Sequence, residues 1–63
     1  MIYLSTMNND EWLEVYHPDV THTQRHRFKD LVQMFYGYEL QTDPDTADIE
    51  RCRVQATNEV LKR

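Results

Sequence analysis

The stretch from Thr21 to Leu40 reads THTQRHRFKDLVQMFYGYEL, and a helical pattern of apolar residues runs through it. Thr21 and Gln24 have the spacing of a capping box, in which each side chain bonds the backbone N–H of the other residue. The apolar residues that follow recur at helical intervals: Phe28, Leu31, Val32 and Phe35. We expect a helix that starts at Thr21 and ends near Tyr36, with Gly37 as the left-handed residue that closes many helices.

A short helix is predicted before this stretch, from about Asn9 to Tyr16. Asn8 is a suitable N-cap, and the two carboxylates in the first turn interact favourably with the positive end of the helix dipole. Pro18 disfavours helical backbone at His17, so the helix should end there. The apolar face that we expect to pack on the rest of the protein is Trp12, Val15 and Tyr16.

A third helix is predicted from Asp43-Pro44 to about Lys62, because Asp followed by Pro is a favourable helix start. Its apolar residues fall into two sectors, which lie roughly 140° apart around the helix. One sector is Ile49, Cys52, Ala56 and Val60, and the other is Ala47, Val54 and Leu61. A lone three-helix domain covers only one sector. We therefore expect the second sector to form the interface of a symmetric homodimer. Either the two third helices meet across a two-fold axis, or each third helix meets the Phe28 to Phe35 helix of the other copy. The alternative is that the sector consists of three scattered surface residues.

Residues 1–63 are expected to form a single all-α domain of three helices with an extended N-terminal arm. The arm contains Ile2, Tyr3 and Leu4, which suit a strand, but a single strand has nothing to pair with. A chain of this length buries only about 60% of its unfolded surface, so association would add to a marginal core. Cys52 is the only cysteine, which excludes an internal disulfide.

The charge balance argues against general affinity for nucleic acid. Seven Lys and Arg against eleven Asp and Glu give a net charge of −4. The stretch from His17 to Lys29 is nevertheless basic, and the stretch from Glu39 to Glu50 is acidic. No apolar run approaches the roughly 18 residues of a membrane span, and no signal-peptide pattern is seen, so we expect a cytoplasmic protein.

His22 and His26 are four residues apart, which on a helix is a spacing that zinc sites use. Two ligands do not complete a site, and the further candidates (His17, Cys52 or a carboxylate) do not stand at a recognisable ligand spacing. We expect these histidines to face solvent and the protein to hold no metal or other cofactor. A catalytic role is not expected either, since the sequence has no phosphate-binding glycine loop and no nucleophile motif.

Arg25, Arg27 and Lys29 surround the start of the central helix, where cations oppose the helix dipole. Three interpretations compete. The cations could pair with Asp45, Asp48 or Glu50, contact a partner protein, or contact nucleic acid. Pairing within the chain is favoured, and nucleic acid is the weakest of the three.

Two functions from different classes are compatible with these features. The preferred one is an interaction module that binds an unidentified host or phage protein, because Tyr, Trp and Arg often anchor interfaces. Its candidate contact residues are Arg25, Arg27, Lys29, Trp12, Tyr36 and Tyr38. The alternative is a small helix-turn-helix regulator, in which the Thr21 to Tyr36 helix or the third helix contacts DNA. The third helix presents Arg51, Gln55 and Asn58 toward base edges, although its acidic start opposes phosphate contacts.

The runs MIYLSTMNNDEWLEVYHPDV and THTQRHRFKDLVQMFYGYELQTDPD, together with the 63-residue length, resemble a small early protein of lambdoid bacteriophages. Proteins of this group are encoded by short open reading frames in the exo to xis interval. The resemblance implies a protein that is made early in infection inside a bacterium and influences the choice between lytic and lysogenic development. It implies no known catalysis, and it assigns no functional residue.

Overall fold

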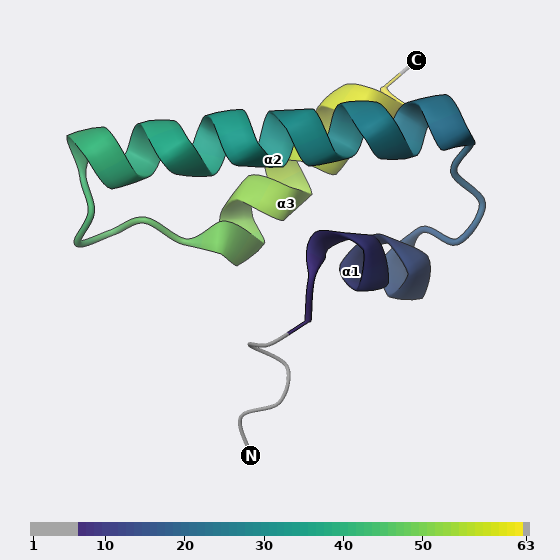
Figure 1. Ribbon diagram of the computed structural model, residues 1–63, viewed down its shortest axis with the longest axis horizontal. Helices are drawn as coiled ribbons and strands as arrows, with labels where there is room; N and C mark the ends of the chain where they lie inside the picture. Colours follow the sequence, from purple (N-terminus) through teal and green to yellow (C-terminus); the bar gives the residue numbers. More distant parts are fainter. Residues whose placement is uncertain (1–6, 63) are drawn as a thin grey trace.

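The computed structural model describes residues 7–62, which form three α-helices and, within that range, no strand. The helices are α1 (Asn9–Tyr16), α2 (His22–Thr42) and α3 (Ile49–Leu61). Figure 1 shows α2 as the long helix, with α3 crossing behind it and α1 lying below. The prediction of an all-α domain with three helices is confirmed. The expected arm with Ile2, Tyr3 and Leu4 lies outside the described residues.

The starts of α1 and α2 follow the predicted capping chemistry. The Thr21 hydroxyl accepts the Gln24 N–H at 3.1 Å, and the Gln24 side chain accepts the Thr21 N–H at 2.9 Å. Asn8 caps α1 in the same way, with Glu11 as its partner at 2.8 and 3.2 Å. These reciprocal bonds satisfy N–H groups that a helix start leaves unpaired, so both helices begin where the sequence predicts.

The predicted end of α2 at Gly37 is wrong. Gly37 lies inside the helix, and no glycine in the described range has a positive φ. The helix ends at Thr42 instead, because Pro44 disfavours helical backbone at the residue before it. Asp43 accordingly leaves the helical region, with φ −154° and ψ 69°. The two apolar residues Tyr38 and Leu40 therefore belong to α2.

The predicted start of α3 at Asp43-Pro44 is also wrong, for a related reason. Asp43 closes α2, and its carbonyl accepts the Thr46 N–H at 3.2 Å in a turn that contains Pro44. Proline at the second position is common both in such turns and at helix starts, so the dipeptide alone does not decide between them. The N-cap of α3 is Asp48, whose side chain accepts the Glu50 N–H at 3.0 Å.

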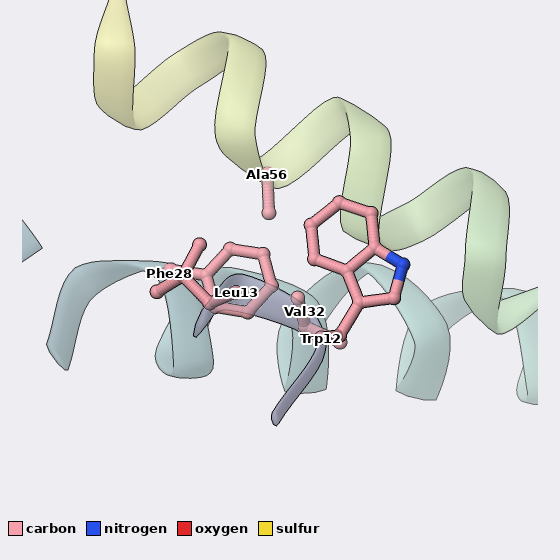
Figure 2. Packing of buried hydrophobic residues seen from close by; sticks show 5 residues of the cluster. All are labelled: Trp12, Leu13, Phe28, Val32 and Ala56. Atoms are coloured by element: carbon pink, nitrogen blue, oxygen red, sulfur yellow. The ribbon is translucent and has the colours of Figure 1, made fainter. Parts of the chain in front are cut away.

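The core lies where the three helices meet (Figure 2). Its fully covered apolar residues are Trp12, Leu13, Phe28, Val32, Cys52 and Ala56. The Trp12 and Phe28 rings are stacked, with centroids 5.6 Å apart and planes 7° from parallel. Leu31 and Phe35 pack against this cluster from α2, so the predicted apolar stripe of that helix is confirmed.

The predicted apolar face of α1 is correct only for Trp12. Val15 and Tyr16 are exposed, and Leu13 is buried in their place. The core lies on the side of α1 between Trp12 and Leu13, and Val15 points roughly 110° away from that direction. Tyr16 sits at the last position of the helix, where its ring lies beside the Trp12 ring at a centroid distance of 4.9 Å.

The inward sector of α3 is confirmed. Cys52 and Ala56 are buried, and the half-buried Ile49 and Val60 pack against the core. The second predicted sector is not continuous. Ala47 precedes the N-cap and therefore lies outside α3. Leu61 is partly covered by the connection between α1 and α2, where it lines a hollow with Tyr16, Val20 and other residues.

Side-chain hydrogen bonds tie α1 to α3. The Trp12 indole Nε1 donates to Glu50 Oε2 at 2.9 Å. Arg53, only 6% exposed, donates from Nε to Asn9 Oδ1 and from Nη2 to the Met7 carbonyl, both at 2.8 Å. Burial of a guanidinium is costly unless its donors are satisfied, and here two neighbouring donors bind two groups of the α1 start. We call these three bonds the α1–α3 clasp.

Replacement of Gly37 by Ala should stabilise the protein. A Cβ at position 37 would meet nothing within 4 Å, and the backbone there is helical. The free energy of unfolding should rise by about 0.5–1 kcal/mol, because Ala loses less backbone entropy than Gly in a helix. Urea denaturation followed by circular dichroism measures the change, and Gly37→Ser should gain less than Gly37→Ala. A loss of stability in Gly37→Ala would contradict a continuous α2.

Replacement of Arg53 by Lys should destabilise the protein although the charge is kept. A single ammonium cannot reproduce the paired donors that reach Asn9 and Met7. We expect the free energy of unfolding to fall by about 1–3 kcal/mol. The matched control is Arg25→Lys at an ion pair on the surface, which should change stability by less than about 0.5 kcal/mol. Equal effects of the two substitutions would contradict the role of the α1–α3 clasp.

Candidate functional site

The basic residues at the start of α2 do not form one group in the structure. Arg25 pairs with Glu14 at 3.1 Å, and Lys29 pairs with Asp10 at 3.2 Å. Both acidic partners belong to α1. The prediction of pairing within the chain is therefore correct for Arg25 and Lys29, but the expected partners Asp45, Asp48 and Glu50 are wrong, because α1 lies along that side of α2.

Arg27 differs from these two cations. It projects roughly 160° around α2 from Lys29 and is exposed. Among residues 7–62 no carboxylate pairs with it. Its side chain borders a shallow hollow that Asp30 and Leu31 also line. Of the three predicted contact cations, Arg27 alone is thus free of an ion pair within the described range.

Apolar side chains continue from Arg27 along the same flank of α2. We define the α2 face by these residues: Arg27, Leu31, Met34, Phe35 and Tyr38. Met34 is 58% exposed and Tyr38 is 68% exposed, whereas Leu31 and Phe35 are half-buried. Between this flank and α3 lies an open hollow of about 460 Å³, lined by Met34, Phe35, Tyr38, Glu39 and Gln55.

Met34 was not among the predicted contact residues, and a signal for it is present in the sequence. Leu31, Met34 and Tyr38 follow Arg27 at intervals of four, three and four residues, which places all four on one flank of a helix. The signal was obscured by the stronger stripe of Phe28 and Val32. An α2 that continues past Gly37 is needed for Tyr38 to join the flank.

Two other predicted contact residues lie elsewhere. Trp12 is 5% exposed and belongs to the core, so its predicted role as an exposed contact residue is wrong. A ring of this size is the main source of apolar burial that α1 can offer to a small core. Tyr36 is half-buried and lies roughly 160° around α2 from Tyr38, away from the α2 face.

An ion pair borders the hollow where α2 meets α3. Arg51 Nη2 donates to Glu39 Oε1 at 2.6 Å, and the Asp48 N–H donates to the same oxygen at 3.3 Å. The hydrogen bond from Arg51 lowers the pKa of Glu39 below its ordinary value, and the Asp48 N–H adds to the effect. The same pairing raises the pKa of Arg51. Charge at this end of the α2 face is therefore locally balanced.

The histidines do not converge. The rings of His22 and His26 lie 5.5 Å apart, edge to face, and both residues are exposed. His17 lies near Trp12, with ring centroids 6.1 Å apart. Within the part of the chain that the structure describes, no cluster of three or more His, Cys, Asp or Glu residues has the arrangement of a metal site.

The thiol of Cys52 is fully covered inside the core. Burial raises the pKa of this thiol, which keeps it in the neutral form at neutral pH. A thiol is a weak nucleophile until it is deprotonated, and a covered one is also closed to a substrate. Cys52 therefore acts as a small apolar residue, which fits its place on the inward sector of α3.

The residues proposed for DNA readout also lie on α3. Arg51 is held by Glu39 and donates to the Thr46 carbonyl at 3.3 Å, which reduces its freedom to reach a base edge. Gln55 lines the hollow beside α2, and Asn58 is exposed one turn further along. The three residues thus share a flank of α3, but the only cation among them is engaged.

Comparison of the chain with models of protein families, with curated proteins and with solved structures finds no match. Among residues 7–62, no helix has both the length and the apolar character that crossing a membrane requires.

The stability that the Glu39–Arg51 pair contributes should depend on pH. Because the pKa of Glu39 is lowered by folding, the contribution is present above the unfolded pKa and is lost as the pH falls through the folded value. The melting temperature of the wild type should exceed that of Glu39→Gln near pH 7, and the difference should shrink between about pH 5 and pH 3.

The control for this experiment is Arg51→Gln, which removes the donor and leaves the carboxylate. The difference in melting temperature between the wild type and Arg51→Gln should also shrink over the same acidic range. Glu39→Gln and Arg51→Gln each remove the same ion pair. Thermal unfolding at fixed ionic strength gives the comparison. If the difference in melting temperature between the wild type and each variant stays constant from neutral pH to pH 3, the ion pair does not contribute to stability.

Proposed function

We propose that the chain is a non-enzymatic early regulatory protein of a lambdoid bacteriophage, which modulates the choice between lytic and lysogenic development through protein–protein contacts in the host cytoplasm. The biological setting comes from the resemblance of the chain to small early phage proteins. The mode of action comes from one observation, the exposure of Met34 and Tyr38 on the α2 face.

The composition of the α2 face supports a protein partner. Tyr and Arg often anchor interfaces, and Met adapts its shape to an irregular partner surface. Here Tyr38, Met34 and Arg27 follow one another along a single flank, with the half-buried Phe35 beside them. An open hollow next to Met34 and Tyr38 offers space for a side chain of the partner. The α2 face thus has residues that can anchor a partner and, beside them, a hollow that can accept one of its side chains.

The distribution of charge supports a protein partner over nucleic acid. Affinity for a phosphate backbone requires several free cations on one surface. Arg25, Lys29 and Arg51 are engaged by Glu14, Asp10 and Glu39 respectively. Arg53 is buried. With a net charge of −4 and so many cations occupied, binding of a phosphate backbone would be weak.

The chemistry of the described residues gives no support to catalysis. A nucleophile needs a base within hydrogen-bond reach, and Cys52 is covered and neutral. His22 and His26 lie edge to face on the surface. Each buried side-chain nitrogen and oxygen in the described range already has a hydrogen-bond partner. The polar groups of the interior are thus used for structure.

Replacement of both Met34 and Tyr38 by Ser should reduce the effect of the protein on phage development without unfolding it. Both side chains are exposed, so the free energy of unfolding should change by less than about 1 kcal/mol. The measurement is the frequency of lysogeny in bacteria that express the wild type or the double variant during infection. The wild type should change the frequency of lysogeny relative to cells without the protein. We expect this change to be less than half as large for the double variant.

The matched control is Val15→Ser, which removes an equally exposed apolar side chain from α1 and should keep the effect. Full activity of the double variant would contradict a role for the α2 face. Tight binding of the wild type to random duplex DNA in a mobility-shift assay, with a dissociation constant below about a micromolar and a steep salt dependence, would favour the DNA-binding alternative instead.

A further inference from the structure

We propose that the partner of the α2 face is the α2 face of a second copy, packed antiparallel across a two-fold axis. The inference rests on the proposed function, because it names the occupant of the same surface. In this dimer the two copies meet through α2, and not through the sector Ala47, Val54 and Leu61 that the sequence led us to expect. Two observations carry it: the spacing of Arg27, Leu31, Met34 and Tyr38 along α2, and the free charge of Arg27.

The spacing is that of a helix pair. Arg27, Leu31, Met34 and Tyr38 follow intervals of four, three and four, which is the a and d pattern of a heptad repeat. The inner two positions are apolar, and the outer two are a cation and an aromatic ring. Phe28 and Val32 pack inside the domain, and the second pattern shares only the half-buried Leu31 with that inward stripe. A helix of 21 residues, about 30 Å long, is long enough to present it.

An antiparallel arrangement makes this seam self-complementary. When two such helices run in opposite directions, an a position of one lies opposite a d position of the other. Leu31 then packs against Met34 of the second copy, and Arg27 lies opposite Tyr38. The two-fold axis repeats each contact, as a symmetric interface requires. Every exposed member of the seam therefore acquires a partner of suitable chemistry.

The charge of Arg27 selects the antiparallel direction. A parallel pair would bring the two Arg27 side chains together, which is unfavourable for like charges. The antiparallel pair instead places each guanidinium near a Tyr38 ring, where the face of the ring attracts a cation. Arg27 is exposed and, within residues 7–62, has no carboxylate partner, and Tyr38 is 68% exposed. Both groups are therefore available for this contact.

A hollow beside the seam leaves space for a side chain of the second copy. The hollow of about 460 Å³ between α2 and α3 is lined by Met34 and Tyr38 and is open to solvent. A side chain of the second copy, such as Leu31 or Met34, has the size and apolar character to enter it. Arg25 and Lys29, which point toward α1, are clear of the seam. Covering Met34 and Tyr38 would also enlarge the apolar burial of a small core.

Exchange of the two outer residues tests both the contact and its direction. Tyr38→Lys places a second cation opposite Arg27, and Arg27→Glu removes the cation that faces the ring. Each single variant should raise the dissociation constant of the dimer by roughly tenfold or more. The double variant, Arg27→Glu with Tyr38→Lys, restores a pair of opposite charges at both ends, and its dissociation constant should return to within about threefold of the wild type.

The compensation can arise only between two chains. Positions 27 and 38 are eleven residues apart, which on one helix is about 16 Å and too far for contact. Sedimentation equilibrium from about one to one hundred micromolar, a range that brackets weak to moderate dimers, gives the dissociation constants. Circular dichroism checks that each variant keeps the helical content of the wild type. Val54→Glu with Leu61→Glu serves as the control on α3 and should leave the dissociation constant unchanged.

The possible outcomes are distinct. A wild type that sediments as a 7.7 kDa monomer throughout would overturn the inference. If Met34→Ser with Tyr38→Ser nevertheless loses its effect on lysogeny, the proposed function survives and the face binds another protein. A dimer that the α3 control dissociates, and the α2 variants do not, would place the interface on α3. A double variant as weak as the single variants would exclude the antiparallel register.

Discussion

The structure depends on the burial of Trp12 between α2 and α3. An isolated helix of eight residues is too short to be stable in water, so α1 persists only through what it packs against. The Trp12 ring stacks on Phe28 and is buried together with Leu13, and its indole N–H would be costly to bury without an acceptor. Glu50 provides the acceptor, and Arg53 holds the residues at the start of the same helix. The apolar packing of Trp12 and the hydrogen bonds of Trp12 and Arg53 thus hold α1 in the same position.

The division of the cations follows from the position of α1. With α1 against one flank of α2, its carboxylates reach Arg25 and Lys29 and leave Arg27 on the opposite flank. The two sides of α2 therefore differ in their ion pairs. One side is neutralised inside the domain, and the other combines a free charge with exposed Met34 and Tyr38.

Much of the fold could be predicted from local sequence signals. The capping box at Thr21 and Gln24, the N-cap at Asn8 and the stripe containing Phe28 and Val32 all act within a few residues, so they were read correctly. Asp43-Pro44 and Gly37 were misread because each suits two local structures, and neighbouring packing decides between them. The site was less accessible to prediction. Whether Trp12 is buried, or Arg25 paired, depends on which flank of α2 receives α1, and no short stretch of sequence encodes that choice.

The location of the only tryptophan has a spectroscopic consequence. The Trp12 indole touches α1, α2 and α3 at once and is shielded from water. Its emission therefore reports the docking of α1, because undocking would expose the ring to solvent and shift the spectrum to longer wavelength. The exposed tyrosine of the α2 face lies on the other side of the central helix from α1. Intrinsic tryptophan fluorescence can thus follow the docking of α1 separately from changes at the α2 face.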